Sequence, residues 1–242
     1  MTISGFEYSS ELVAQFPLAR AEILHVTDID NGSQLAALAD EYRAVQAEVA
    51  LRLATEPASG RESIRAWRAA FTAFGVKPTQ HRNAAEALLR RLDRAGDIPS
   101  ISMLVDIGNL VSISHSLPVA VFDADKVVGV LAVTLARGIE QFAGLGAAES
   151  ETPEAGEVIF IDEASQVAAR RWCWKQGGAT ATGPSTTSAV FVTEAVHDGN
   201  QADVEAAAVE LERLILTHMP GCTVSRYVTA SDSPSARFGS AR

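Results

Sequence analysis

The chain has 242 residues, of which 47% are hydrophobic, and 30 Asp and Glu residues outnumber 20 Lys and Arg residues, giving a net charge of −10. This length allows a large core without disulfides or a structural metal, and the acidic balance excludes a protein that binds nucleic acid non-specifically over its whole surface. Two cysteines, Cys173 and Cys222, are too few for a disulfide framework or a four-ligand zinc site.

No targeting signal or membrane-spanning segment is predicted. Residues 1–16 lack a basic region followed by an apolar run. The most apolar stretch, residues 127–136, is about ten residues long, whereas a spanning helix needs roughly 20. The histidines show no spacing typical of a metal site. We therefore expect a soluble protein of the cytoplasm that uses no metal or other cofactor.

The chain begins with a predicted strand and three predicted helices, over residues 21–30, 33–52, 62–74 and 83–96. The helices are indicated by apolar residues at three- and four-residue spacing. Ser33 is a suitable N-cap for the first, and Gly75 ends the second. Asn83 opens the third, and Glu86 follows it at the spacing of a capping box.

The pattern changes after Pro99, where short β-branched runs alternate with turn signals. They predict strands over residues 101–107, 110–114, 119–123, 127–135, 157–162, 166–174 and 188–196. A helix over residues 202–218 and a strand over residues 223–229 follow. Because no long helix separates the central strands, we expect an α+β fold with helices around an all-strand block, and no alternating parallel sheet.

Positive charge is concentrated between residues 61 and 94, where eight basic residues accompany three acidic ones. A local basic face in an acidic protein steers polyanions to one side of the molecule. The candidate RNA phosphate contacts are Arg65, Arg68, Arg82, Arg90 and Arg91. The alternative is the ordinary solvated face of two amphipathic helices.

A specific motif covers residues 74–123. It contains Asp106-Ile-Gly-Asn109-Leu-Val-Ser112, followed at fixed distances by Leu117-Pro118 and Phe122-Asp123, and is preceded by Arg82-Asn83-x-x-Glu86-x-Leu-Leu-Arg90-Arg91. This region resembles the editing (B3/B4) domain of the phenylalanyl-tRNA synthetase β subunit, and is most similar to free-standing relatives of that domain. The resemblance extends in weaker form to about Tyr227.

The resemblance implies a layered β-sheet or β-sandwich core with flanking helices. It also implies a domain over residues 61–230. From the sequence pattern we expect residues 1–60 to form a strand-helix subdomain packed on it, and the serine-rich residues 231–242 to form a mobile tail. In the synthetase, the domain binds the 3′ end of a charged tRNA and hydrolyses the ester when tyrosine has replaced phenylalanine, as a second sieve. The implied partner is therefore a tRNA acceptor end carrying an amino acid, and the implied activity is its deacylation in trans.

Individual residues carry over as follows. The pocket asparagine of the family falls on Asn109, and the histidine of bacterial synthetases falls on Ala120. The glycine-rich pocket wall aligns with residues 170–178, where two tryptophans and three cations replace small residues. The glutamate that reads the tyrosine hydroxyl corresponds to Glu194, with Thr187 as its accompanying threonine at a spacing slipped by one residue.

The chemistry of these residues leaves alternatives open. Backbone N–H groups of Gly177 and Gly178 can act as catalytic donors to an ester oxyanion, or the glycines can form a plain turn. Asn109, expected just after a strand, can contact the substrate or form an Asx turn. Trp172 and Trp174 would share one face of a regular strand, where they can stack on the terminal adenine or pack in the core.

The opposing class of function is a non-catalytic module that binds an amino acid or another small molecule, without RNA. A third is a regulatory or scaffold protein that kept the fold and lost the chemistry, which is consistent with Ala120. Salt-dependent tRNA binding distinguishes the RNA-binding protein from the other two classes.

Overall fold

The computed structural model describes residues 2–30 and 35–239. Within these residues two β-sheets and six α-helices form an α+β fold, which confirms the fold class predicted from the sequence. The six-stranded sheet has the order β10 (Ser235–Arg237), β1 (Ile3–Tyr8), β4 (Gly129–Leu135), β5 (Val158–Ile161), β6 (Val167–Arg170) and β7 (Lys175–Gln176). The four-stranded sheet has the order β3 (Val119–Asp123), β8 (Ala189–Ala195), β2 (Arg20–Thr27) and β9 (Thr223–Ala230).

The strand pairs are antiparallel, except that β1 runs parallel to β4. The helices are α1 (Ser10–Gln15), α2 (Leu35–Thr55), α3 (Glu62–Ala73), α4 (Ala84–Ala95), α5 (Met103–His115) and α6 (Gln201–His218). Two short 3-10 turns, η1 (Ala58–Gly60) and η2 (Ala124–Lys126), complete the described elements.

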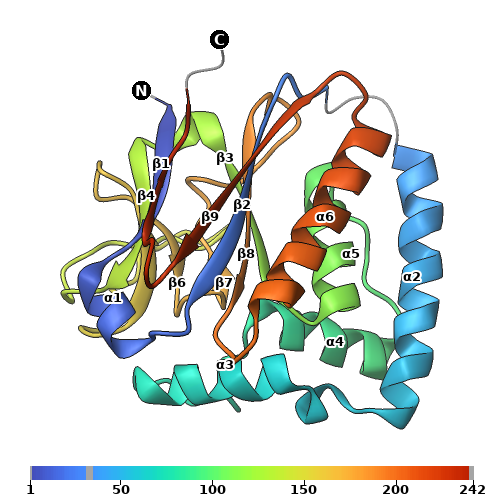
Figure 1. Ribbon diagram of the computed structural model, residues 1–242, viewed down its shortest axis with the longest axis horizontal. Helices are drawn as coiled ribbons and strands as arrows, with labels where there is room; N and C mark the ends of the chain where they lie inside the picture. The colour runs from blue at the N-terminus through green and yellow to red at the C-terminus, as the bar shows by residue number, and fades with distance from the viewer. Residues whose placement is uncertain (1, 31–34, 240–242) are drawn as a thin grey trace.

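The elements form three layers (Figure 1). The six-stranded sheet packs on one face of the four-stranded sheet. Helices α2, α5 and α6 lie on the other face of the four-stranded sheet. Strand β8 shows why, because all seven of its residues are buried. Val190 and Val192 belong to the core between the sheets, and Phe191 belongs to the core under the helices. A strand buried on both faces requires a layer on each side.

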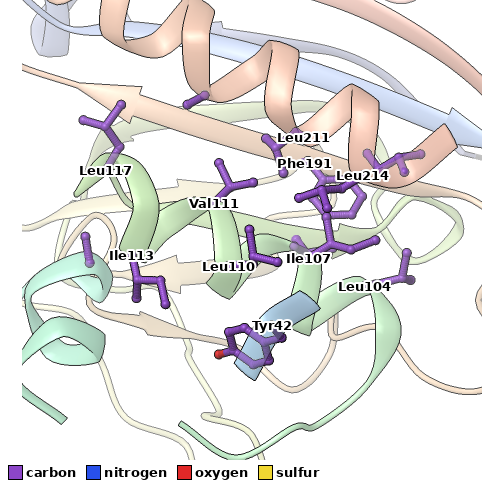
Figure 2. Packing of buried hydrophobic residues seen from close by; sticks show 14 of the residues in the cluster. Tyr42, Leu104, Ile107, Leu110, Val111, Ile113, Leu117, Phe191, Leu211 and Leu214 are labelled. Carbon is purple, nitrogen blue, oxygen red and sulfur yellow. The ribbon is translucent and has the colours of Figure 1, made fainter. Parts of the chain in front are cut away.

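Helix α5 lies at the centre of the helical core. Figure 2 shows its side chains between Leu211 and Leu214 of α6 on one side and Tyr42 of α2 on the other. Gly108 allows α5 to approach β3 closely, because a Cβ atom at this position would lie 3.1 Å from Cγ2 of Val121. This helix lies within the motif that carries the family resemblance.

The strands predicted over residues 101–107 and 110–114 are wrong, because residues 103–115 form α5. Ser102 caps this helix by accepting a hydrogen bond from the backbone N–H of Val105. Nine of its residues are buried, so it has almost no polar face. Apolar residues then occur at both strand and helix spacings, and periodicity alone cannot separate the two structures.

The predicted strand over residues 166–174 is only partly correct. β6 ends at Arg170, the chain turns through residues 171–174, and β7 begins at Lys175. The other central strands occur as β3, β4, β5 and β8, and the outer elements occur as β2, β9, α2, α3, α4 and α6. Asn83 caps α4 as predicted. The Ser33 N-cap lies outside the described residues.

The described residues before position 61 contribute strands to both sheets. β1 lies inside the six-stranded sheet, and β2 lies between β8 and β9. The predicted mobile tail also includes a strand, since residues 235–237 form β10 and pair with β1. β1, α1 and β10 were not predicted, because each is short and its apolar pattern spans few residues.

Candidate functional site

The turn at residues 171–174 has a strained backbone. Arg171 and Trp172 have φ angles of 47° and 56°, in the left-handed region that non-glycine residues rarely adopt. Three hydrogen bonds hold the turn: Arg171 N–H donates to a Glu157 carboxylate oxygen (3.0 Å), Trp172 N–H to the Val158 carbonyl (2.6 Å) and Trp174 N–H to the Arg171 carbonyl (3.2 Å). Such strain persists only where surrounding contacts fix it, and it is concentrated at functional sites.

A buried ion pair anchors this turn. Arg170 donates two hydrogen bonds to Glu157, at 2.9 and 2.8 Å, and both side chains are almost fully buried. A third bond, of 2.6 Å, joins Arg170 to Glu151. Because a buried charge is tolerated only with such partners, the conformation at residue 170 is well fixed, and so is the start of the turn.

Trp172 points into the core between the two sheets. Its ring packs edge-to-face on Trp67 and Phe16, with centroid distances of 4.9 and 5.0 Å. Its Nε1–H donates a 2.9 Å hydrogen bond to Oε1 of Glu194. The hydroxyl of Tyr8 donates to the same oxygen at 2.8 Å.

Glu194 is thus a buried carboxyl group with two neutral donors. Burial raises its pKa to about 7, against the lowering effect of the hydrogen bonds from Trp172 and Tyr8. The sequence pointed to Glu194 but not to Tyr8, which lies in the unpredicted strand β1. The only signal was the spacing of Ile3, Phe6 and Tyr8, which is too short and irregular to predict a strand.

Trp174 is only half-buried, and because residues 171–174 form a turn, the prediction that both tryptophans share one strand face is wrong. The guanidinium of Arg171 lies 4.5 Å from the centre of its ring, and His81 contacts the ring edge-to-face at 4.6 Å. The Lys175 ammonium is 5.6 Å away. A tryptophan surrounded by cations and partly open to solvent can stack a nucleobase.

Trp174 lines a groove of about 620 Å³. It is lined by α4 with the residues before it and by residues 57–59 around η1. The groove contains four arginines against one acidic residue, Asp93. We call it the basic groove, and its polar and aromatic lining consists of Ser59, Gln80, Arg82, Arg90, Arg91, Asp93, Arg94 and Trp174.

The structure divides the five predicted RNA-binding arginines. Arg82, Arg90 and Arg91 line the basic groove. Arg68 instead donates two hydrogen bonds, of 3.0 and 2.5 Å, to the buried Glu86 and so joins α3 to α4. Arg65 lines a different hollow, of about 610 Å³, between α3 and residues 15–19. Sequence spacing could not reveal this division, because it depends on how the two helices pack.

A second, much smaller pocket adjoins the groove, and the two share Trp174 in their linings. We call it the small pocket. It has a volume of about 80 Å³. Its apolar walls are formed by Pro118, Val119, Ala120, Phe160, Ala169 and Trp172. Ala120, which replaces the histidine of the family, is therefore part of a pocket.

Gly177 and Gly178 have their backbone N–H groups already hydrogen bonded. Gly177 donates to the Ala168 carbonyl at 2.7 Å, and Gly178 donates to the Ala143 carbonyl at 2.9 Å. Neither group is available to an oxyanion in this arrangement. A Cβ atom on Gly177 would lie 2.9 Å from the Val167 carbonyl, so close backbone packing explains this glycine.

Asn109 and Thr187 are not brought to the small pocket. Asn109 lies in the middle of α5, on the side that faces Tyr42 of α2, so the predicted position after a strand is wrong. Thr187 is exposed at the opposite end of β8 from Glu194, and its carbonyl accepts a hydrogen bond from Ile29. Thr187 and Glu194, which the resemblance assigned to one site, therefore lie at opposite ends of β8.

Other chemistries have little support in the described residues. Burial raises the pKa of Cys173 well above its usual value, which opposes a thiolate nucleophile. Over residues 2–30 and 35–239, no set of three or more His, Cys, Asp and Glu side chains is arranged to hold a metal ion. In the same part of the chain, every helix is too short or too polar to cross a membrane.

Comparison with known proteins gave three findings. The family model of the B3/4 domain matches residues 66–211. The phenylalanine–tRNA ligase beta subunit of Neisseria gonorrhoeae is 52% identical over 56 residues, which are 23% of this chain and 7% of that protein. The corresponding subunit of Neisseria meningitidis is 54% identical over 48 residues, 20% of this chain and 6% of that protein. The matched stretches therefore span a small part of these curated relatives.

Among solved structures, an N-terminal fragment of the phenylalanyl-tRNA synthetase beta-subunit from Pyrococcus horikoshii is similar. Its TM-score is 0.49 and its sequence identity is 12%, and the alignment covers 95% of this chain and 55% of that chain.

Proposed function

The chain belongs to the B3/4 domain family, and from this premise we propose that it binds the 3′ acceptor end of a tRNA in the basic groove. The observation that carries the proposal is the combination of Arg82, Arg90, Arg91 and Arg94 with the partly exposed ring of Trp174. Arginines neutralise phosphates, and stacking of one base on an aromatic ring contributes about 1–3 kcal/mol. The curated relatives are subunits of a ligase that acts on tRNA.

The net charge of the whole molecule also favours RNA binding at the basic groove. The chain carries a net charge of −10, so most of its surface repels RNA. An RNA end is therefore attracted to the basic groove rather than to the hollow beside it, where Glu154 and Glu157 offset Lys77 and Arg171. The two hollows share Gln80.

We further propose that the bound aminoacyl ester is hydrolysed in trans. A terminal nucleotide stacked on Trp174 would hold its ester at the small pocket, because Trp174 lines both. Water would add to the ester carbonyl and the bond to the ribose oxygen would break, releasing the amino acid and uncharged tRNA. Donors other than Gly177 and Gly178 would have to stabilise the oxyanion, since both N–H groups are occupied.

The test measures tRNA binding as a function of salt for the wild type and for the double variant Arg91→Ala/Arg94→Ala. Both arginines are exposed, so their removal should leave the fold intact. We expect the double variant to bind about tenfold more weakly at low salt. Its slope of log K against log salt should be smaller by about one unit for each lost phosphate contact.

The matched control is Arg43→Ala, which removes an exposed arginine from α2, outside the groove. It should bind like the wild type. Absence of tRNA binding by the wild type at low salt, or equal losses in both variants, would overturn the proposal. Ester loss from a panel of charged tRNAs, measured in the same samples, separates a deacylase from a non-catalytic binding module.

A further inference from the structure

We propose that the small pocket receives a small aliphatic side chain, about the size of that of alanine, from the amino acid on the tRNA. This inference depends on the proposed function, because the basic groove must first hold the acceptor end. It concerns a different property, the identity of the amino acid that the site accepts. The resemblance to a domain that selects tyrosine does not establish which amino acid this site accepts.

The volume of the pocket is the first argument. It is about 80 Å³, whereas a protein cavity that holds benzene has a volume of about 150 Å³. The aromatic ring of phenylalanine or tyrosine therefore does not fit. A methyl or isopropyl group fits, and its surroundings are mostly apolar, with Phe160, Ala120 and Ala169 among the walls. Burying such a group strengthens binding roughly fourfold for each carbon.

Trp172 fixes this size. Its indole forms one wall of the pocket and is held by the rings of Trp67 and Phe16 and by the hydrogen bond to Glu194. Moving the indole aside would break these ring contacts and remove one of the two donors to a buried carboxyl group, which is unfavourable. The pocket therefore does not enlarge readily to admit a ring.

Tyr8 supplies an independent argument. Its hydroxyl donates to Glu194 at 2.8 Å, at the same oxygen that accepts from Trp172. A phenol from the chain itself thus occupies the carboxylate with which the resemblance associates recognition of tyrosine. The hydroxyl of a bound tyrosine would have to displace one of these two buried donors. Both its size and its polar group therefore exclude tyrosine.

The experiment uses RNA minihelices that carry the amino acid through a stable 3′-amide, so that hydrolysis cannot interfere. Binding is measured for minihelices bearing alanine, valine, phenylalanine, tyrosine or no amino acid. We expect the alanine form to bind roughly fourfold more tightly than the uncharged RNA, and the valine form at least as tightly as the alanine form. The phenylalanine and tyrosine forms should bind no more tightly than the uncharged RNA.

Ala120→Leu fills the pocket and should abolish the preference for alanine. Its matched control is Ala206→Leu on the exposed face of α6, which should preserve the preference. If Ala120→Leu fails to fold, the wild-type series alone decides. Binding of all RNAs without a preference, or a preference for tyrosine, would overturn the inference and leave the proposed function intact.

A second measurement separates the two proposals when no RNA binds. The NMR signal of the Trp172 indole N–H is followed on addition of the 3′-alanyl-amide or 3′-tyrosyl-amide of adenosine. A shift with the alanyl compound alone would support the small pocket and contradict only the tRNA proposal. No shift with either compound, or a shift with the tyrosyl compound alone, would overturn the inference.

Discussion

Glu194 is a carboxyl group buried among apolar residues, and its two hydrogen-bond donors only partly compensate for that burial. It lies on a strand whose neighbours are apolar, and its relative exposure is only 2%. An ionised carboxylate there would be costly, and the hydrogen bonds from Tyr8 and Trp172 offset only part of this cost. The physical result is a carboxyl group that keeps its proton to near neutral pH.

This property gives a prediction for the pH dependence of stability. The pKa of Glu194 is about 7 in the folded protein, against an ordinary value of 4.5. Between these values the folded state holds a proton that the unfolded state has released. The free energy of unfolding should therefore fall as the pH rises through this window. Its contribution is on the order of 3 kcal/mol, and is fully present only below the lower value.

Glu194→Gln should remove this part of the pH dependence, because an amide oxygen accepts the same hydrogen bonds without titrating. Urea unfolding at pH 5 and pH 8 measures the difference for both proteins. An exposed substitution, Glu149→Gln, serves as the control and should behave like the wild type. Identical pH dependence in the wild type and in Glu194→Gln would show that this carboxyl group is ionised throughout.

At the scale of elements, α3 and α4 show how packing changes the meaning of a charge pattern. The i, i+4 spacing of Arg82, Glu86 and Arg90 is visible in the sequence. Only the packing of α3 on α4 brings Arg68 to Glu86, and this removes one cation from the set available to RNA. Arg82, Arg90 and Arg91 line the groove beside η1, although Arg82 and Arg90 also lie 3.6 and 3.8 Å from Glu86.

The pairing of β10 with β1 is a second feature of this scale, and it depends on a glycine. A Cβ atom on Gly5 would lie 2.6 Å from the carbonyl oxygen of Ala236. β10 pairs with the edge of β1, and directly after β10 the Phe238 N–H donates a hydrogen bond to the Ser4 carbonyl. Gly5 is therefore required by the close approach of two strands.

Gly5→Ala should displace β10 and lower the free energy of unfolding by about 1–3 kcal/mol, as overpacking of tight sites does. Amide hydrogen exchange over residues 235–238 should accelerate. The matched substitution is Gly60→Ala, where nothing lies within 4 Å of the added atom. A loss for Gly5→Ala no greater than that for Gly60→Ala would argue against a tight pairing of these strands.

At the scale of the whole molecule, the N-terminal quarter of the chain is interlaced with the rest. β2 pairs with β8 on one side and β9 on the other, and β1 pairs with β4 and β10. Both sheets therefore need strands from before residue 60. The cores on the two sides of the four-stranded sheet include residues of β2, with Ile23 in one and Leu24 in the other.

It follows that residues 61–242 alone should not fold, although they contain the whole of the family match. Without β2, the edges of β8 and β9 would be unpaired and both cores would be open. Circular dichroism and NMR of the fragment measure this, and mixing it with a separate fragment 1–60 should restore structure. A fragment 61–242 that unfolds cooperatively on its own would contradict the interlaced arrangement.

The sequence by itself determined the fold class, most of the outer helices and strands, the family resemblance and the position of the basic cluster. These features are recorded locally, as periodic apolar positions, capping residues and motifs of fixed spacing. α5 was assigned wrongly because a helix buried on nearly all sides has no polar face to mark its period.

Only the tertiary structure decided what the candidate site residues do. Two left-handed residues send Trp172 into the core and leave Trp174 half-buried beside it, and Tyr8 reaches Glu194 across 186 positions of sequence. It also showed that the backbone donors of Gly177 and Gly178 are occupied. The physical reason is that backbone strain and long-range contacts are sustained by the packed surroundings, which no local stretch of sequence contains.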